Sequence, residues 1–368
     1  MTTLTAAPAP AVPALPRSPY FVSAFWDFAC LGGASIILYV VMRLFTENER
    51  TETVIAAGAA LAWIINWPHF AATNARLYGS RENLAQYPIT AIGAPLFVFV
   101  GIFASLRFPN LIAPWWCKLF MFWSPYHFSG QTVGLTLLYA RRTGFHFSKV
   151  MRLCLSSFVF SSYLLPIVRF EATTTGSQYY GIKYPSLGIP QWTPDVVTAL
   201  LITSGLGLAV LVAQKAITEK RRPPPIVLLP AVTQVVWFLP GGRWATFSEF
   251  VPLFHSLQYM LVAWSLMLKE KLDGGGHQPS VRFVVGSSVR WYVLVVLGGG
   301  VLFWALPHLM SRASGTTIWF STAIVIAGVQ IHHFFVDGVI WKLRSKNVSS
   351  PLLGTFDELT GAATKDRP

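Results

Sequence analysis

The chain has 368 residues, of which 53% are hydrophobic and only 12% are charged. A soluble domain carries about 25% charged residues, so this composition excludes a water-soluble globular protein of this length. The net charge of +13 fits the Lys- and Arg-rich cytoplasmic loops of a membrane protein better than a nucleic-acid surface, so the bilayer is an expected partner and nucleic acid is not.

Apolar stretches recur along the chain, and each is long enough to cross a bilayer, which needs about 20 residues. The predicted fold class is therefore all-α, a polytopic integral membrane helix bundle of about ten transmembrane helices. The seventh span is short and lies between proline- and glycine-rich segments, so a re-entrant segment is an alternative there. We expect spans at roughly 24–45, 53–76, 88–107, 113–140, 150–169, 195–216, 225–240, 247–268, 290–310 and 316–341.

The distribution of Lys and Arg sets the predicted orientation. With a cytoplasmic N-terminus, the positive clusters at 76–81, 141–152, 215–222, 269–290 and 342–346 all fall on the cytoplasmic side, as does the C-terminus. We predict a disordered N-terminal tail at 1–20, one transmembrane domain at 21–345 and a cytoplasmic C-terminal tail at 346–368. The expected location is a bacterial inner membrane, and the polar, Tyr-rich loop 170–194 is expected to cap the outer side.

Of the eight histidines, His146 and His277 fall in predicted loops and His308 lies near a helix end; the other five lie inside four spans that all run from the outside to the cytoplasm. They lie about 10 to 20 Å from the cytoplasmic helix ends, so they share one layer of the bilayer. A single intramembrane His is usually a hydrogen-bonding core residue, but five at one depth favour a metal site, and imidazole suits Fe, Cu and Zn. The candidate metal ligands are His69, His127, His255, His332 and His333.

Polar companions lie at helical spacing from these histidines, which predicts that they face the bundle interior. Asp337 shares a stripe with His333, whereas His332 points about 100° away. Asp337 is expected either to orient His333 or to form an ion pair near Lys342. The predicted polar faces are Asn66, His69 and Thr73; His127 and Gln131; His255, Gln258 and Tyr259; and Gln330, His333 and Asp337.

Four short segments carry a resemblance to a known family. They are Pro68-His69-Phe70-Ala71-Ala72, His127-Phe128-Ser129-Gly130, His255-Ser256-Leu257-Gln258-Tyr259, and His332-His333-Phe334-Phe335-Val336-Asp337. In order and in membrane location they resemble the motifs of the Brp/Blh family of integral membrane carotene dioxygenases. The resemblance implies a non-haem Fe(II) held by His that activates dioxygen to cleave a polyene, and it places His69, His127 and His255 at ligand positions.

The chain departs from the family pattern at several positions. Tyr259 stands where the third motif has its second His, and Thr73 stands where the first motif ends in Asp. In the fourth motif the spacing to Asp337 singles out His332, whereas the helical face favours His333. We take Tyr259 and Asp337 as candidate catalytic residues, and a related oxidation of another lipid is as consistent with these departures as polyene cleavage.

The favoured function is a membrane-embedded His-ligated metalloenzyme, a non-haem iron oxygenase that acts on a carotenoid or another lipid-soluble small molecule. The alternative is a proton-coupled membrane transporter with an intramembrane His/Asp relay, although the chain shows none of the repeated halves common in transporters. Haem binding through axial His and a non-catalytic scaffold with histidines as hydrogen-bonding core residues are two further readings.

Overall fold

A computed structural model describes residues 18–49, 51–173, 175–341 and 356–361, so most of the two predicted tails lies outside the described residues. The described chain is helical except for one short hairpin and the connecting loops. Within these ranges, nine helices are long and apolar enough to cross a membrane. The predicted all-α polytopic membrane bundle is confirmed.

Two π-helical turns interrupt the first two spans, and the helices then follow the predicted order closely. The first half of the chain forms α1 (Ala24–Phe28), η1 (Ala29–Gly33), α2 (Ala34–Phe45), α3 (Glu52–Leu61), η2 (Ala62–Asn66), α4 (Trp67–Tyr78), α5 (Arg81–Gln86), α6 (Pro88–Arg107), α7 (Ala113–Arg142) and α8 (Lys149–Glu171). The second half forms β1 (Ser177–Tyr179), β2 (Ile182–Tyr184), α9 (Thr193–Thr218), α10 (Pro225–Phe238), η3 (Gly241–Arg243), α11 (Ala245–Ser248), α12 (Val251–Asp273), α13 (Val281–Gly300), η4 (Val301–Ala305), α14 (Leu306–Ser314), α15 (Ile318–Ile340) and α17 (Phe356–Thr360).

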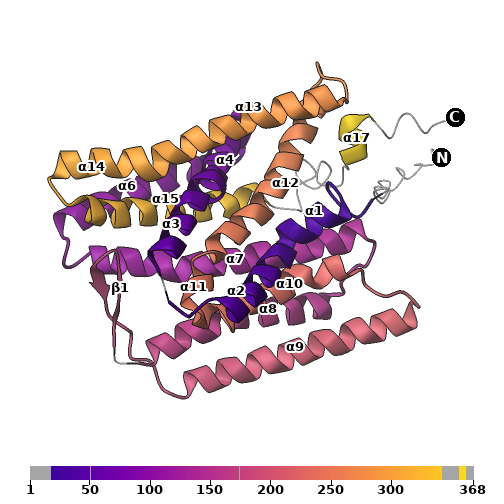
Figure 1. The fold of residues 1–368 in the computed structure, drawn as a ribbon, viewed down its shortest axis with the longest axis horizontal. Helices are drawn as coiled ribbons and strands as arrows, with labels where there is room; N and C mark the ends of the chain where they lie inside the picture. Colours follow the sequence, from indigo (N-terminus) through magenta and orange to yellow (C-terminus); the bar gives the residue numbers. More distant parts are fainter. Residues whose placement is uncertain (1–17, 50, 174, 342–355, 362–368) are drawn as a thin grey trace, which may run out of the picture.

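Helix α7 has 30 residues, which is long enough to cross a bilayer, but it is less apolar than the nine. Its middle carries His127 and Gln131, polar residues that a lipid-facing helix would not tolerate. In Figure 1, α7 runs through the centre of the bundle, where other helices surround it. Together with the nine, α7 completes the ten spans predicted from the sequence.

The predicted span 290–310 begins too late. Helix α13 starts at Val281, nine residues earlier, and continues through a π-helical turn to Ser314. The hydroxyl of Ser280 caps this start by accepting a hydrogen bond from the Phe283 backbone N–H. Arg282 and Arg290, which we placed in the preceding loop, therefore lie within the helix. The membrane tolerates them there because long cationic side chains can extend from a helix end toward the headgroups.

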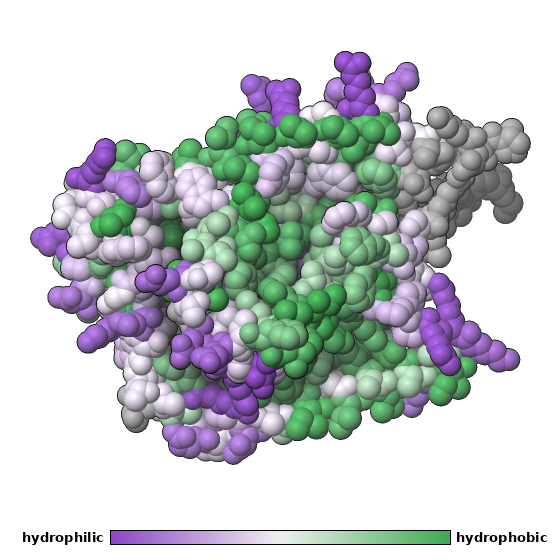
Figure 2. All heavy atoms as spheres, viewed as in Figure 1, coloured by the Kyte–Doolittle hydropathy of each residue, from purple (hydrophilic) through white to green (hydrophobic). Residues whose placement is uncertain are grey.

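The bundle has two helical sides around a central group. Helices α8, α9 and α10 pack together on one side, α6, α13 and α14 lie on the other, and α4, α7, α12 and α15 lie between them (Figure 1). Hydrophobic side chains fill the middle of the face shown in Figure 2, and hydrophilic ones gather toward its edges. The Phe356 N–H donates to the Phe21 carbonyl over 3.0 Å, so the first and last described segments lie at the same end of the bundle, as expected if both termini share one side.

The hairpin of β1 and β2 caps the opposite end, where we expected loop 170–194 to form a cap. Ile182 packs in a core with Trp116 and Phe120 of α7. Below the cap, Lys118 donates to Glu171 over 2.9 Å, and both side chains are buried. The cap is thus fixed to α7 by apolar packing and by a hydrogen bond of 2.6 Å from Lys118 to the Pro185 carbonyl, while the ion pair joins α7 to the end of α8.

A backbone break at Gly32 supports the central helices. Gly32 has φ +152°, a conformation that side-chain-bearing residues rarely adopt, and its α-carbon lies against Thr233 of α10. The neighbouring Leu31 carbonyl accepts a hydrogen bond of 2.8 Å from Gln258 on α12. The close approach of η1 to α10 therefore places the Leu31 carbonyl where Gln258 of α12 can donate a hydrogen bond to it.

Replacing Gly32 by Ala should destabilise the protein by about 2–4 kcal/mol, because the new methyl group would collide with Thr233 and the backbone would be strained. Thermal unfolding in detergent measures the loss. Gly58→Ala in α3 is the matched control, since a Cβ there meets nothing within 4 Å and Ala favours a helix. Equal melting temperatures for the two variants would contradict this account of Gly32.

Candidate metal centre

Four helices each supply one histidine to the centre of the bundle. His69 lies on α4 directly after Pro68 and the π-helical turn η2, and His333 lies on α15. His127 follows Pro125 in α7, and His255 follows Pro252 in the first turn of α12. Proline lacks an N–H, so three of these helices lack one backbone donor one to three residues before their histidine, whereas α15 contains no proline. The hydroxyls of Ser129 and Ser256 donate to the Pro125 and Pro252 carbonyls.

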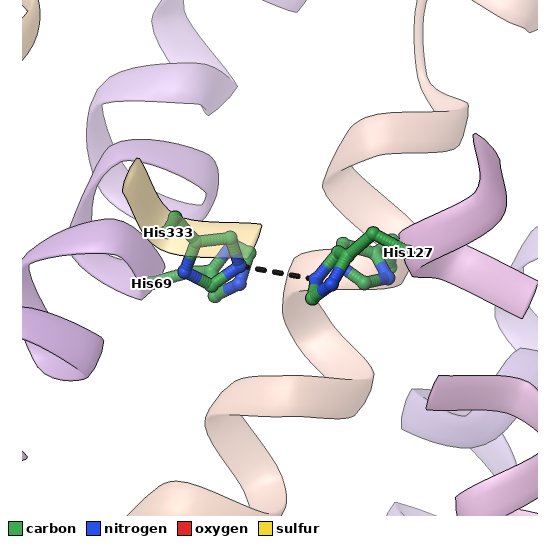
Figure 3. Close-up of side chains that lie close together, drawn as sticks. His69, His127 and His333 are labelled. Atoms are coloured by element: carbon green, nitrogen blue, oxygen red, sulfur yellow. Dashed lines mark hydrogen bonds between the residues drawn. The ribbon is translucent and has the colours of Figure 1, made fainter. Parts of the chain in front are cut away.

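The four rings converge on one point. One potential ligand atom from each of His69, His127, His255 and His333 lies within 4.8 Å of all the others. The Nε2 atoms of His127 and His333 lie 3.1 Å apart. Figure 3 shows His69 and His333 on one side, facing His127 across this contact. The ring centroids of His69 and His333 lie 4.3 Å apart, and those of His127 and His255 lie 5.0 Å apart.

Several nitrogens of this cluster are buried without a hydrogen-bond partner: His69 Nε2, His333 Nδ1 and both ring nitrogens of His255. An unpartnered polar atom in an apolar interior is costly, so such a concentration needs an explanation. Imidazole nitrogens lie about 2.0–2.1 Å from a zinc-sized ion, so two ligands of one ion are at most about 4.2 Å apart. Inward shifts of a few tenths of an ångström would meet that limit, and the residues fit a metal ion.

Ser256 orients one of the rings. Its hydroxyl lies 2.8 Å from Asn66 Oδ1 and 2.9 Å from the Pro252 carbonyl, both of which can only accept a hydrogen bond from it. The same oxygen lies 3.1 Å from His69 Nδ1, so it accepts from the Nδ1–H. This tautomer leaves the lone pair of His69 on Nε2, the unpartnered atom, which is the arrangement that a metal ligand requires.

Asp337 lies at the edge of the cluster. Its Oδ2 is 3.3 Å from His333 Nε2 and 3.6 Å from His127 Nε2, while its Oδ1 accepts from Thr73 and Trp341, each over 3.2 Å. Asp337 does contact His333, but at Nε2, the nitrogen that faces His127, and not at Nδ1, which has no partner; Lys342 lies outside the described residues. The Tyr259 hydroxyl is 2.6 Å from the Thr73 hydroxyl, so Tyr259, Thr73 and Asp337 form one hydrogen-bonded group.

His332 does not join the cluster. Its Nε2 lies 2.9 Å from the Tyr78 hydroxyl, and the two rings stack at 5.9 Å. The expectation that all five intramembrane histidines converge therefore holds for four. The physical reason is the rotation of about 100° between consecutive residues of a helix, which turns His332 toward α4 when His333 faces the centre. The helical-face argument selected the right residue of the pair, and the motif spacing selected the wrong one.

Aromatic side chains enclose the histidines. The ring of Phe128 stacks on His255 at 4.0 Å, that of Phe334 stacks on His127 at 4.9 Å, and Phe70 contacts His333 at 4.7 Å. Sequence reasoning did not identify these residues, nor the roles of Ser256 and Trp341. Phe70, Phe128 and Phe334 each follow a cluster histidine, and Trp341 lies four residues after Asp337, so helical spacing could have indicated Trp341.

A cavity of about 330 Å³ lies beside the cluster, between α7, α12 and α15. His127, Tyr259 and Asp337 line it together with apolar residues such as Leu135 and Val262. The cavity therefore gives a small molecule access to the edge of the histidine cluster.

Comparisons with protein-family models, with curated proteins and with solved structures find no match to this chain. The resemblance to the Brp/Blh family stays a prediction that rests on the four short segments. The geometry itself shows four helices of a membrane bundle that bring together four histidines able to hold a metal ion.

Replacing any one of His69, His127, His255 or His333 by Ala should remove most of the bound metal from purified protein, because each ring supplies one ligand. His332→Ala is the matched control, since its neighbour His333 is in the cluster and His332 is not. Elemental analysis gives the metal content per chain. Full metal content in His255→Ala, or its loss in His332→Ala, would contradict this assignment.

Ser256→Ala should weaken metal binding by about 10–100-fold without unfolding the chain, because His69 loses the partner that fixes its tautomer. Competition with a coloured chelator measures the affinity. The control is Ser105→Ala on α6, a buried serine whose hydroxyl donates to the Gly101 carbonyl of its own helix. Unchanged affinity in Ser256→Ala would show that Ser256 does not orient a ligand.

Proposed function

We propose that this chain is a membrane-embedded metalloenzyme, a non-haem iron oxygenase that acts on a carotenoid or another lipid-soluble substrate in a bacterial inner membrane. The observation that carries the proposal is the convergence of His69, His127, His255 and His333, with unpartnered nitrogens, inside a bundle of membrane-crossing helices. Such intramembrane ionisable residues are functional sites by default, because their burial is otherwise costly.

The chemistry of the ligands supports a transition metal. Four imidazoles suit iron, copper or zinc, and the resemblance of the four segments to the Brp/Blh motifs favours iron. Iron bound by His69, His127, His255 and His333 would supply the dioxygen chemistry of a non-haem oxygenase. Phe70, which contacts His333, and the other rings packed on the cluster would exclude bulk water from it.

The cavity supports a lipid-soluble substrate. Its wall is largely apolar, and it lies between helices that cross the membrane. Asp337 and the Tyr259 hydroxyl line the wall near His127, and Thr73 connects the two through hydrogen bonds. This group can hold a proton or position a polar substrate atom beside His127, which is why both residues are candidate catalytic groups.

One observation favours the proton-coupled transporter instead. Asp337 Oδ2 lies within 3.6 Å of the Nε2 atoms of both His127 and His333, a contact through which a proton could pass. The transporter needs no metal, so metal content separates the two functions.

The test begins with protein purified in detergent under anaerobic conditions, for which the proposal predicts about one equivalent of iron per chain. Co-expression in a carotene-producing bacterium then tests the substrate class: loss of pigment with formation of an apocarotenal is expected for the wild type and not for His127→Ala, while His332→Ala should keep activity. Metal-free protein with unchanged pigment would contradict the proposal and favour the transporter.

A further inference from the structure

A second space adjoins the cavity on the bilayer-facing side. This groove lies between α7 and α8 and is lined by apolar and aromatic residues, among them Phe122, Leu164 and Ile167. It shares Trp123 and Tyr126 with the cavity beside His127, so the two spaces meet at these two rings. Tyr126 is 52% exposed, and its ring lies 5.3 Å from that of Phe160 on α8. Tyr126 therefore stands between the lipid and the cavity.

Three glycines leave open space along the cavity, and two of them, Gly130 and Gly338, are exposed. Gly130 and Gly134 lie one turn apart on α7, Gly338 lies on α15, and all three line the cavity. A Cβ at any of them would meet nothing within 4 Å, so these positions face open space rather than a packed neighbour. Glycine destabilises a helix relative to alanine, so three of them around one cavity suggest that the missing side chains leave room for a ligand.

The shape of the cavity limits what fits. On α7 its lining runs from Trp123 to Leu138, about 22 Å at 1.5 Å per residue. The cavity thus extends along α7, and this shape suits an extended hydrocarbon chain.

The charge of the lining limits the ligand further. Among the described residues that line the cavity there is no Lys or Arg, and Asp337 is the one acidic group. In the metal-free protein, a carboxylate or phosphate inside would face Asp337 without a cation to pair with, which is unfavourable in a low-dielectric site.

We propose that the cavity binds a neutral, extended apolar chain, which enters from the bilayer between α7 and α8 past Tyr126 and lies along Gly130, Gly134 and Gly338 with one segment beside His127. The assignment of the binding site depends only on the geometry of the cavity, whereas any reaction of the bound chain depends on the proposed iron oxygenase.

Binding is tested with two fluorescent polyenes of equal length, parinaryl alcohol and parinaric acid, added to the full chain in lipid nanodiscs. Energy transfer from the protein's tryptophans to the polyene is followed as the polyene is added, and its saturable part measures binding to the protein. In metal-free protein at neutral pH, the alcohol should bind at least about tenfold more tightly than the acid, because the acid brings a second carboxylate next to Asp337.

Gly130→Leu and Gly338→Leu, on opposite walls, should each weaken binding of the alcohol by about tenfold or more, because the new side chain fills the space of several methylenes. Gly286→Leu is the matched control, an exposed glycine on α13 where a Cβ also meets nothing within 4 Å. Tyr126→Ala should raise the association rate, because the ring no longer covers the entrance.

The measurement is repeated after metal removal with a chelator, and the metal content of each preparation is determined separately. Selective binding in a protein that never contains metal would support the cavity assignment while ending the oxygenase proposal. Equal binding by Gly130→Leu, Gly338→Leu and Gly286→Leu, or equal affinity of the metal-free protein for acid and alcohol, would overturn the cavity assignment. An association rate unchanged in Tyr126→Ala would overturn the lateral entrance.

Discussion

The burial of four imidazoles with unpartnered nitrogens is the constraint on which the rest of the structure depends. In a bilayer interior, every such atom must find a partner or destabilise the fold. The surrounding residues satisfy some of the nitrogens and leave others directed at a common point: Ser256 accepts from one nitrogen of His69, whereas the other nitrogen faces the cluster without a partner. A metal ion at that point would bind one nitrogen of each of the four rings at once, which single hydrogen bonds would not do.

The bundle is arranged to keep these rings in place. Polar contacts connect the central helices to one another: Gln131 donates to the His255 carbonyl and to Gln258, each over 3.0 Å, and Gln258 donates to the Leu31 carbonyl near the break at Gly32. Within a membrane such hydrogen bonds, together with close packing, take over much of the role that hydrophobic association has in water. The α7–α12 contact, and with it the spacing of His127 and His255, is therefore fixed by groups that line the site itself.

Sequence reasoning predicted the membrane class, the helix order and the layer of histidines, because apolar length and helical periodicity are local properties of the chain. The 100° rotation between neighbouring helix positions predicted that His332 and His333 point in different directions, but the sequence alone left open which of the two faces the site. It did not predict the start of α13, because Arg282 and Arg290 disguise an early start in a hydropathy pattern. Nor could it find the stacking of Phe128 on His255, since that contact joins α7 to α12 and depends on how the helices pack.

X-ray absorption at the edge of the bound metal, on the purified wild-type protein, tests the central claim most directly. The account predicts nitrogen ligands at about 2.0–2.1 Å with the outer-shell scattering of about four imidazole rings, and fewer such rings in His255→Ala. A metal with only oxygen or sulfur ligands, or a wild-type protein that binds no metal when iron is supplied, would contradict it.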